Sequence, residues 1–144
     1  MGEYKPVLTA VENGKGCLDV DTVKGCAHAA DVLNGCYGAC YAVKTARFRG
    51  IDFSRPVVRR IHGSAHARRI EHAVRNAPQG FFRVGTMGDP SYAWGHTLRI
   101  IEWLAPLAMP VIVTKHWRTL DDGDVCRLVE CGAVLKKFFE GLRG

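Results

Sequence analysis

The chain has 144 residues, a length typical of one domain with a single hydrophobic core. Hydrophobic residues make up 47% and charged residues 24% of it, which excludes a collagen, a coiled coil and a wholly disordered chain. No apolar run approaches the about 20 residues that a membrane span needs, and the first residues lack the apolar stretch of a signal peptide. We therefore expect a cytoplasmic protein with no membrane partner.

The charge is moderately basic, since Lys and Arg outnumber Asp and Glu by 20 to 14. A phosphate-bearing ligand or a nucleic acid is therefore allowed as a partner but not required. Much of the excess lies in residues 44–75, which contain Lys44, Arg47, Arg49, Arg55, Arg59, Arg60, Arg68, Arg69 and Arg75. A nucleic-acid surface and a solvated helix face both fit this stretch, and the lack of interleaved aromatic residues favours the solvated face.

The first elements are predicted to be a β-hairpin. Strands are expected over Val7–Val11 and Cys17–Val23, joined by the turn residues Asn13 to Gly16, because Asn and Gly tolerate positive φ. A loop of small residues and cysteines follows over residues 26–40. A helix is then expected over Tyr41–Phe48.

Helices and strands alternate in the rest of the chain. The predicted elements are a helix over Ala65–Asn76 with Ser64 as its N-cap, a strand over Phe81–Val84, a helix over Ser91–Leu104, a strand over Pro110–Thr114, a helix over Asp121–Cys131 and a strand over Ala133–Leu135. Alternation of this kind predicts βα units and a parallel sheet. The α/β class is therefore expected.

Three polar segments follow successive predicted strands. The cysteine loop follows the first, Gly85 to Pro90 the second, and Thr114 to His116 the third. Ligands of parallel βα folds bind beyond the carboxyl ends of the strands. The sequence therefore predicts one site at this edge of the sheet.

The cysteine loop carries Cys26, Cys36 and Cys40 in the spacing C-x9-C-x3-C. Three thiolates hold three irons of a four-iron cluster and leave the fourth iron open to another ligand. Zinc is the competing metal, although it usually needs four ligands in C-x2-C pairs, which are absent here; Cys17 or His28 is a candidate fourth ligand. Buried free cysteines are the third reading. The remaining thiols, Cys17, Cys126 and Cys131, are expected in the core.

The residues of this loop resemble a known family. Gly25-Cys26, Gly35-Cys36 and Cys40-Tyr41-Ala42 are similar to the cluster loop of radical S-adenosylmethionine (radical SAM) proteins, and most of all to divergent phage-associated radical-SAM-like proteins. Val84 to Pro90 resembles their glycine-acid-proline segment, and Val113 to Arg118 resembles their L-T-K-R segment. The resemblance covers residues 17–135. The spacing departs from the usual C-x3-C-x2-C loop of the family.

The resemblance implies an enzyme that uses a 4Fe-4S cluster and S-adenosyl-L-methionine (SAM) to generate a 5′-deoxyadenosyl radical. Cys26, Cys36 and Cys40 would hold the cluster. Asp89 would accept a hydrogen bond from the SAM ammonium group. Further SAM contacts are expected from Gly85, Gly88, Thr114, Lys115 and Tyr41. Asp89 is equally the N-cap of the helix that Pro90 begins, and the two roles are compatible.

The resemblance also implies a partial (βα) barrel of about four parallel strands with helices outside, preceded by the short hairpin. Residues 1–144 would form a single radical-SAM-like domain, shorter than the barrel of the family. The implied partners are a substrate of unknown identity, an electron donor such as a flavodoxin or ferredoxin, and a second chain that completes the barrel. The alternative function is a non-catalytic cysteine–metal module, with zinc or iron–sulfur, whose basic face over residues 44–75 binds nucleic acid or phosphate.

Overall fold

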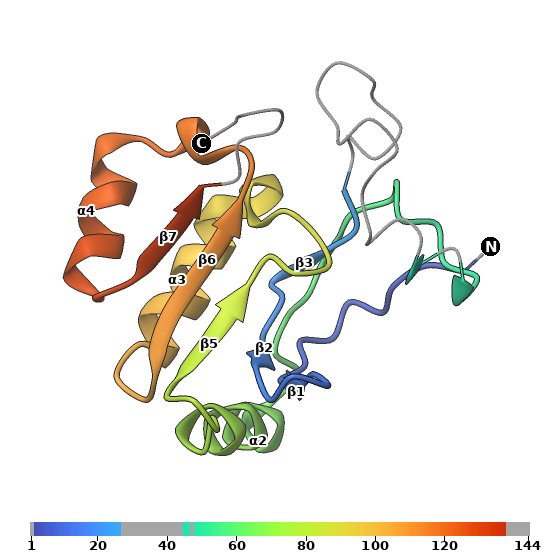
Figure 1. Ribbon diagram of the computed structural model, residues 1–144, viewed down its shortest axis with the longest axis horizontal. Helices are drawn as coiled ribbons and strands as arrows, with labels where there is room; N and C mark the ends of the chain where they lie inside the picture. Colours follow the sequence, from blue (N-terminus) through green and yellow to red (C-terminus); the bar gives the residue numbers. More distant parts are fainter. Residues whose placement is uncertain (1, 27–44, 47, 138–144) are drawn as a thin grey trace.

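The computed structural model describes residues 2–26, 45–46 and 48–137, which form a mixed α/β fold (Figure 1). Its main sheet contains, in spatial order, β1 (Val11–Glu12), β2 (Leu18–Asp19), β5 (Phe81–Val84), β6 (Met109–Thr114) and β7 (Val134–Lys137). β1 is antiparallel to β2, whereas β2, β5, β6 and β7 are parallel. The hairpin and the parallel sheet are therefore confirmed. The described strands form an open sheet, so the expected barrel is not seen among them.

The helices alternate with the strands as predicted. They are α2 (Ser64–Arg75), the 3-10 turn η1 (Pro90–Ala93), α3 (Trp94–Leu104), the 3-10 turn η2 (Trp117–Thr119) and α4 (Asp122–Glu130). α3 lies across the sheet behind β5 and β6, and α4 lies beside β7 (Figure 1). Among the described residues, no helix has the length and apolar character needed to cross a bilayer.

The core lies between the sheet and α3. Leu98, Ile101 and Leu104 recur at helical spacing and are fully buried. Phe82 and Val84 of β5 pack against them in the same cluster. Strand alternation then puts Phe81 and Arg83 on the opposite face of β5. This core holds β5 in place and therefore positions the segment that follows it.

The first predicted strands are shorter than expected. The expected strand Cys17–Val23 is divided into β2 and β3 (Val23–Lys24), and β3 pairs antiparallel with β4 (Val57–Val58) in a separate two-stranded sheet. The chain leaves the main sheet at Asp21, whose buried carboxylate binds the segment after β5 and not a neighbouring strand. β4 was not predicted because two valines are too short to show a period. Val7 forms only an isolated bridge with Arg60.

Some helix ends differ from the prediction. Ser64 is the first residue of α2 and not its cap; Gly63, with φ of 101°, occupies that position without a side-chain hydrogen bond. The predicted helix Ser91–Leu104 begins as the 3-10 turn η1 before α3. α4 begins one residue after its predicted start, and Asp121 is its N-cap, whose side chain accepts from the Asp124 amide at 2.8 Å. Of the predicted helix 41–48, the described residues 45–46 and 48 are helical, and the others lie outside the described part.

Candidate site at the carboxyl edge of the sheet

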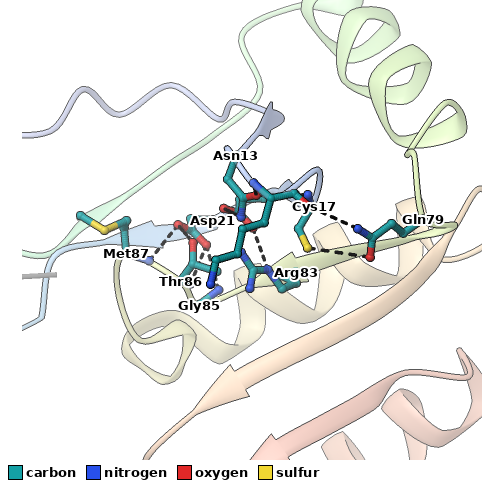
Figure 2. Close-up of polar contacts among 10 residues, drawn as sticks. Asn13, Cys17, Asp21, Gln79, Arg83, Gly85, Thr86 and Met87 are labelled. Carbon is teal, nitrogen blue, oxygen red and sulfur yellow. Dashed lines mark hydrogen bonds and ion pairs between the residues drawn. The ribbon is translucent and has the colours of Figure 1, made fainter. Parts of the chain in front are cut away.

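Asp21 fixes the segment that follows β5. Asp21 is 2% exposed, and its carboxylate accepts from the backbone amides of Gly85 at 2.9 Å, Thr86 at 3.0 Å and Met87 at 3.0 Å. The Thr86 hydroxyl donates a fourth bond at 2.8 Å. Figure 2 shows the carboxylate facing this segment. Sequence reasoning missed Asp21, because Leu18-Asp19-Val20-Asp21 alternates between apolar and polar residues, and this pattern predicts the two aspartates on the solvent face of a strand.

Gly85 and Gly88 allow the backbone to pack against itself. Gly85 has φ of 107°, and a Cβ there would overlap the carbonyl oxygen of Val113. A Cβ on Gly88 would overlap the carbonyl oxygen of Val23. Gly88 also forms a bridge with Gly25, whose amide donates to the Met87 carbonyl at 2.9 Å. The start of the cysteine loop therefore lies directly beside the glycine-acid-proline segment.

Asp89 joins this segment to the end of β6. Its Oδ1 accepts from the Ser91 amide at 3.0 Å, which confirms the predicted N-cap, and from the Thr114 hydroxyl at 2.7 Å. Its Oδ2 accepts from the Lys115 amide at 3.1 Å. The buried Thr114 oxygen also accepts from the His116 amide at 3.0 Å. Two of the three predicted segments are thus directly bonded, and Thr114 orients Asp89.

Cys26 lies next to these segments. Its thiol is half-buried beside a small apolar cluster formed by Ala46 and Phe53 with Met87, and its amide donates to the Phe53 carbonyl at 2.7 Å. Cys36, Cys40 and Tyr41 lie outside the described residues, so the three-thiolate set stays a prediction. Within the described part, no three His, Cys, Asp or Glu residues gather as metal ligands.

The other cysteines are less buried than expected. Cys126 on α4 is exposed, so its expected place in the core is wrong. Cys17 is half-buried, and its thiol lies 3.9 Å from Oε1 of Gln79 (Figure 2). Cys131 is half-buried against the main core, and desolvation, followed by the charges of Glu102 and Glu130, raises the pKa of its thiol.

The basic stretch is only partly a solvated face. Arg68, Arg69 and Arg75 are exposed on α2, as expected. Arg59 and His66 are instead buried, which corrects that expectation. The His66 ring is bonded to the Leu8 carbonyl at 2.8 Å and to the His62 amide at 2.9 Å, so it is a structural residue.

Comparisons with protein-family models, with curated proteins and with solved structures found no match to this chain. We therefore argue its function from the contacts at the carboxyl edge of the sheet. Gly25, Asp89 and Thr114 are the residues through which the three predicted segments meet there.

Proposed function

We propose that the protein is a radical SAM enzyme that holds a 4Fe-4S cluster through Cys26, Cys36 and Cys40 and binds SAM at the carboxyl edge of its parallel sheet. One arrangement carries the proposal: the Gly25–Gly88 bridge and the Asp89–Thr114 hydrogen bond bring the start of the cysteine loop and the other two resembling segments together. Parallel α/β sheets bind their ligands at this edge. In this proposal the open sheet is part of a partial barrel.

The Asp89 carboxylate is a suitable acceptor for the ammonium group of SAM. Asp89 Oδ2 accepts one bond among the described residues, and a carboxylate oxygen has a second lone pair for a ligand ammonium group. Thr114 and the Lys115 amide hold that carboxylate in place, so its orientation is set before a ligand binds. Asp21 does the same for the backbone of residues 85–87.

The apolar surroundings of Cys26 fit a redox group. Ala46, Phe53 and Met87 border it, and a hydrophobic shell limits the access of water to a cluster. The chemistry that a bound cluster and SAM supply is reductive cleavage of SAM to methionine and a 5′-deoxyadenosyl radical, which abstracts hydrogen from a substrate. The electron comes from a separate donor such as a flavodoxin or ferredoxin.

The ligand assignment is tested by substitution of the cysteines. The protein is purified without oxygen, reconstituted with iron and sulfide, and assayed for bound iron. Cys36→Ala and Cys40→Ala are each expected to lose most of the iron, because two remaining thiolates hold a four-iron cluster poorly. Cys126→Ala, at an exposed thiol on α4, is the matched control and should retain it. Unchanged iron content in the Cys36 and Cys40 variants would contradict the assignment.

One observation favours the alternative, a cysteine–metal module that binds nucleic acid. Arg68, Arg69 and Arg75 are exposed on α2 and form no ion pair with any other described residue. Unpaired arginines on one helix can contact phosphates. This alternative expects a colourless protein with stoichiometric zinc and salt-dependent oligonucleotide binding that is lost when the three arginines are replaced.

A further inference from the structure

A second group of polar side chains lies where the N-terminal segment meets β3 and β4, next to the glycine-acid-proline segment, because Lys24 of β3 packs against Gly88. The Arg59 amide donates to the Thr22 carbonyl at 2.9 Å and so extends the β3–β4 ladder by one pair. In that register Lys24 and Arg59 lie on the same face, one diagonal step apart. The Lys24 ammonium lies 5.6 Å from the centroid of the Tyr4 ring. Two cations and a phenol therefore share this place.

Three polar atoms of Arg59 and Tyr4 are buried without partners. Arg59 is only 6% exposed, and its Nε and Nη1 make no hydrogen bond. The Tyr4 hydroxyl is also buried and unbonded, while its ring is held edge-on against Phe53 at 6.4 Å. Leaving such donors unpaired is costly, and for a guanidinium the cost is greater than for a neutral group. A group of this kind is best explained by a ligand that supplies the missing acceptors.

The charges around this place are predominantly positive. The charge of Asp21 acts on Tyr4, Lys24 and Arg59, and its oxygens already accept four hydrogen bonds from residues 85–87. The charge of Asp19 acts on Lys24, and Asp19 is already paired with Arg83. Arg49 adds a further positive charge that acts on Tyr4 and Lys24. Burial, and then the charge of Arg59, lowers the pKa of Lys24. An anion bound here would reduce the repulsion among the positive charges of Arg49, Lys24 and Arg59.

We propose that Arg59, Lys24 and the Tyr4 hydroxyl form a binding site for the phosphate group of a small molecule. The positive excess suits a dianion better than a single carboxylate. The unpaired donors are of the types that bind phosphate oxygens, with Arg59 as the central one. The proposal does not rest on the cluster or on SAM, since Arg59, Lys24 and Tyr4 are not among the residues proposed to hold either group, although they lie beside them.

The test is a titration of the purified protein with inorganic phosphate. Binding is measured by calorimetry and by the change in melting temperature. Saturable binding is expected, with a melting temperature that rises with phosphate concentration. Arg59→Met should weaken the binding by about tenfold or more, and Tyr4→Phe by a smaller factor, because it removes only the hydroxyl. Arg60→Met, at the exposed neighbouring residue, is the matched control and should bind phosphate as the unaltered protein does.

Two further measurements separate binding from a structural role. Without phosphate, Arg59→Met should melt at the same temperature as the unaltered protein or higher, because it removes an unpaired buried charge. Acetate should bind far more weakly than phosphate. A lower melting temperature for Arg59→Met combined with an unchanged response to phosphate would overturn the proposal. Binding of an oligonucleotide without any response to inorganic phosphate would also overturn it.

Discussion

Replacement of Asp21 by Ala is expected to destabilise the fold by about 4 kcal/mol. The side chain is buried, and its removal leaves the amides of residues 85–87 and the Thr86 hydroxyl without their acceptor. It also removes the negative charge that partly compensates Arg59 and Lys24. Because whole domains are stable by only about 5–15 kcal/mol, urea unfolding should show a large shift of the midpoint.

Asp19→Asn is the matched control for this substitution. Asp19 forms an ion pair with Arg83 at 2.9 Å, but the two side chains are 20% and 30% exposed. Partly exposed pairs of this kind contribute up to about 1 kcal/mol, so a small midpoint shift is expected. Equal shifts for Asp21→Ala and Asp19→Asn would refute the view that Asp21 holds the segment after β5.

The substitution Gly85→Ala is expected to cost about 3–4 kcal/mol, again measured by urea unfolding. Two effects add at this residue. Its φ of 107° is unfavourable for any residue with a Cβ, and the new methyl group would overlap the Val113 carbonyl oxygen and the Pro90 ring. The segment must then move away from β6, which would also displace Asp89 from Thr114.

Two other glycines separate the effects. Gly80 has φ of 76° but nothing within 4 Å of its added Cβ, so Gly80→Ala should cost only about 1 kcal/mol, from backbone strain alone. Gly14 has open space and no positive φ, so Gly14→Ala should change stability by less than about 0.5 kcal/mol. If Gly85→Ala were as mild as Gly80→Ala, the close packing of residue 85 on β6 would be disproved.

Most of the fold could be predicted from the sequence because its signals are local. Apolar spacing marked α3 through Leu98, Ile101 and Leu104, and the apolar runs marked β5 and β6. What failed depends on distant contacts. The division of the expected strand Cys17–Val23 follows from the hydrogen bonds between Asp21 and residues 85–87, more than 60 positions away, and no periodicity in a single strand can show them.

The site could be predicted in part. Asp89 was correctly predicted to lie near Thr114 and Lys115, because these residues follow neighbouring strands and the carboxyl ends of parallel strands meet at one edge of the sheet. The glycines were expected to contact a ligand, which stays a prediction; the structure shows that Gly85 and Gly88 also make room for the chain itself. Arg59 was missed because composition reports only that a stretch is basic, and burial of one arginine depends on the strands packed around it.

The most direct test of the proposed function is the response of the reconstituted cluster to SAM. The protein is loaded with iron and sulfide without oxygen and reduced, and its electron paramagnetic resonance spectrum is recorded before and after SAM is added. We expect the cluster signal to change on addition, because the iron without a thiolate takes SAM as its ligand. An iron-loaded protein whose spectrum is the same at saturating SAM would contradict the proposal.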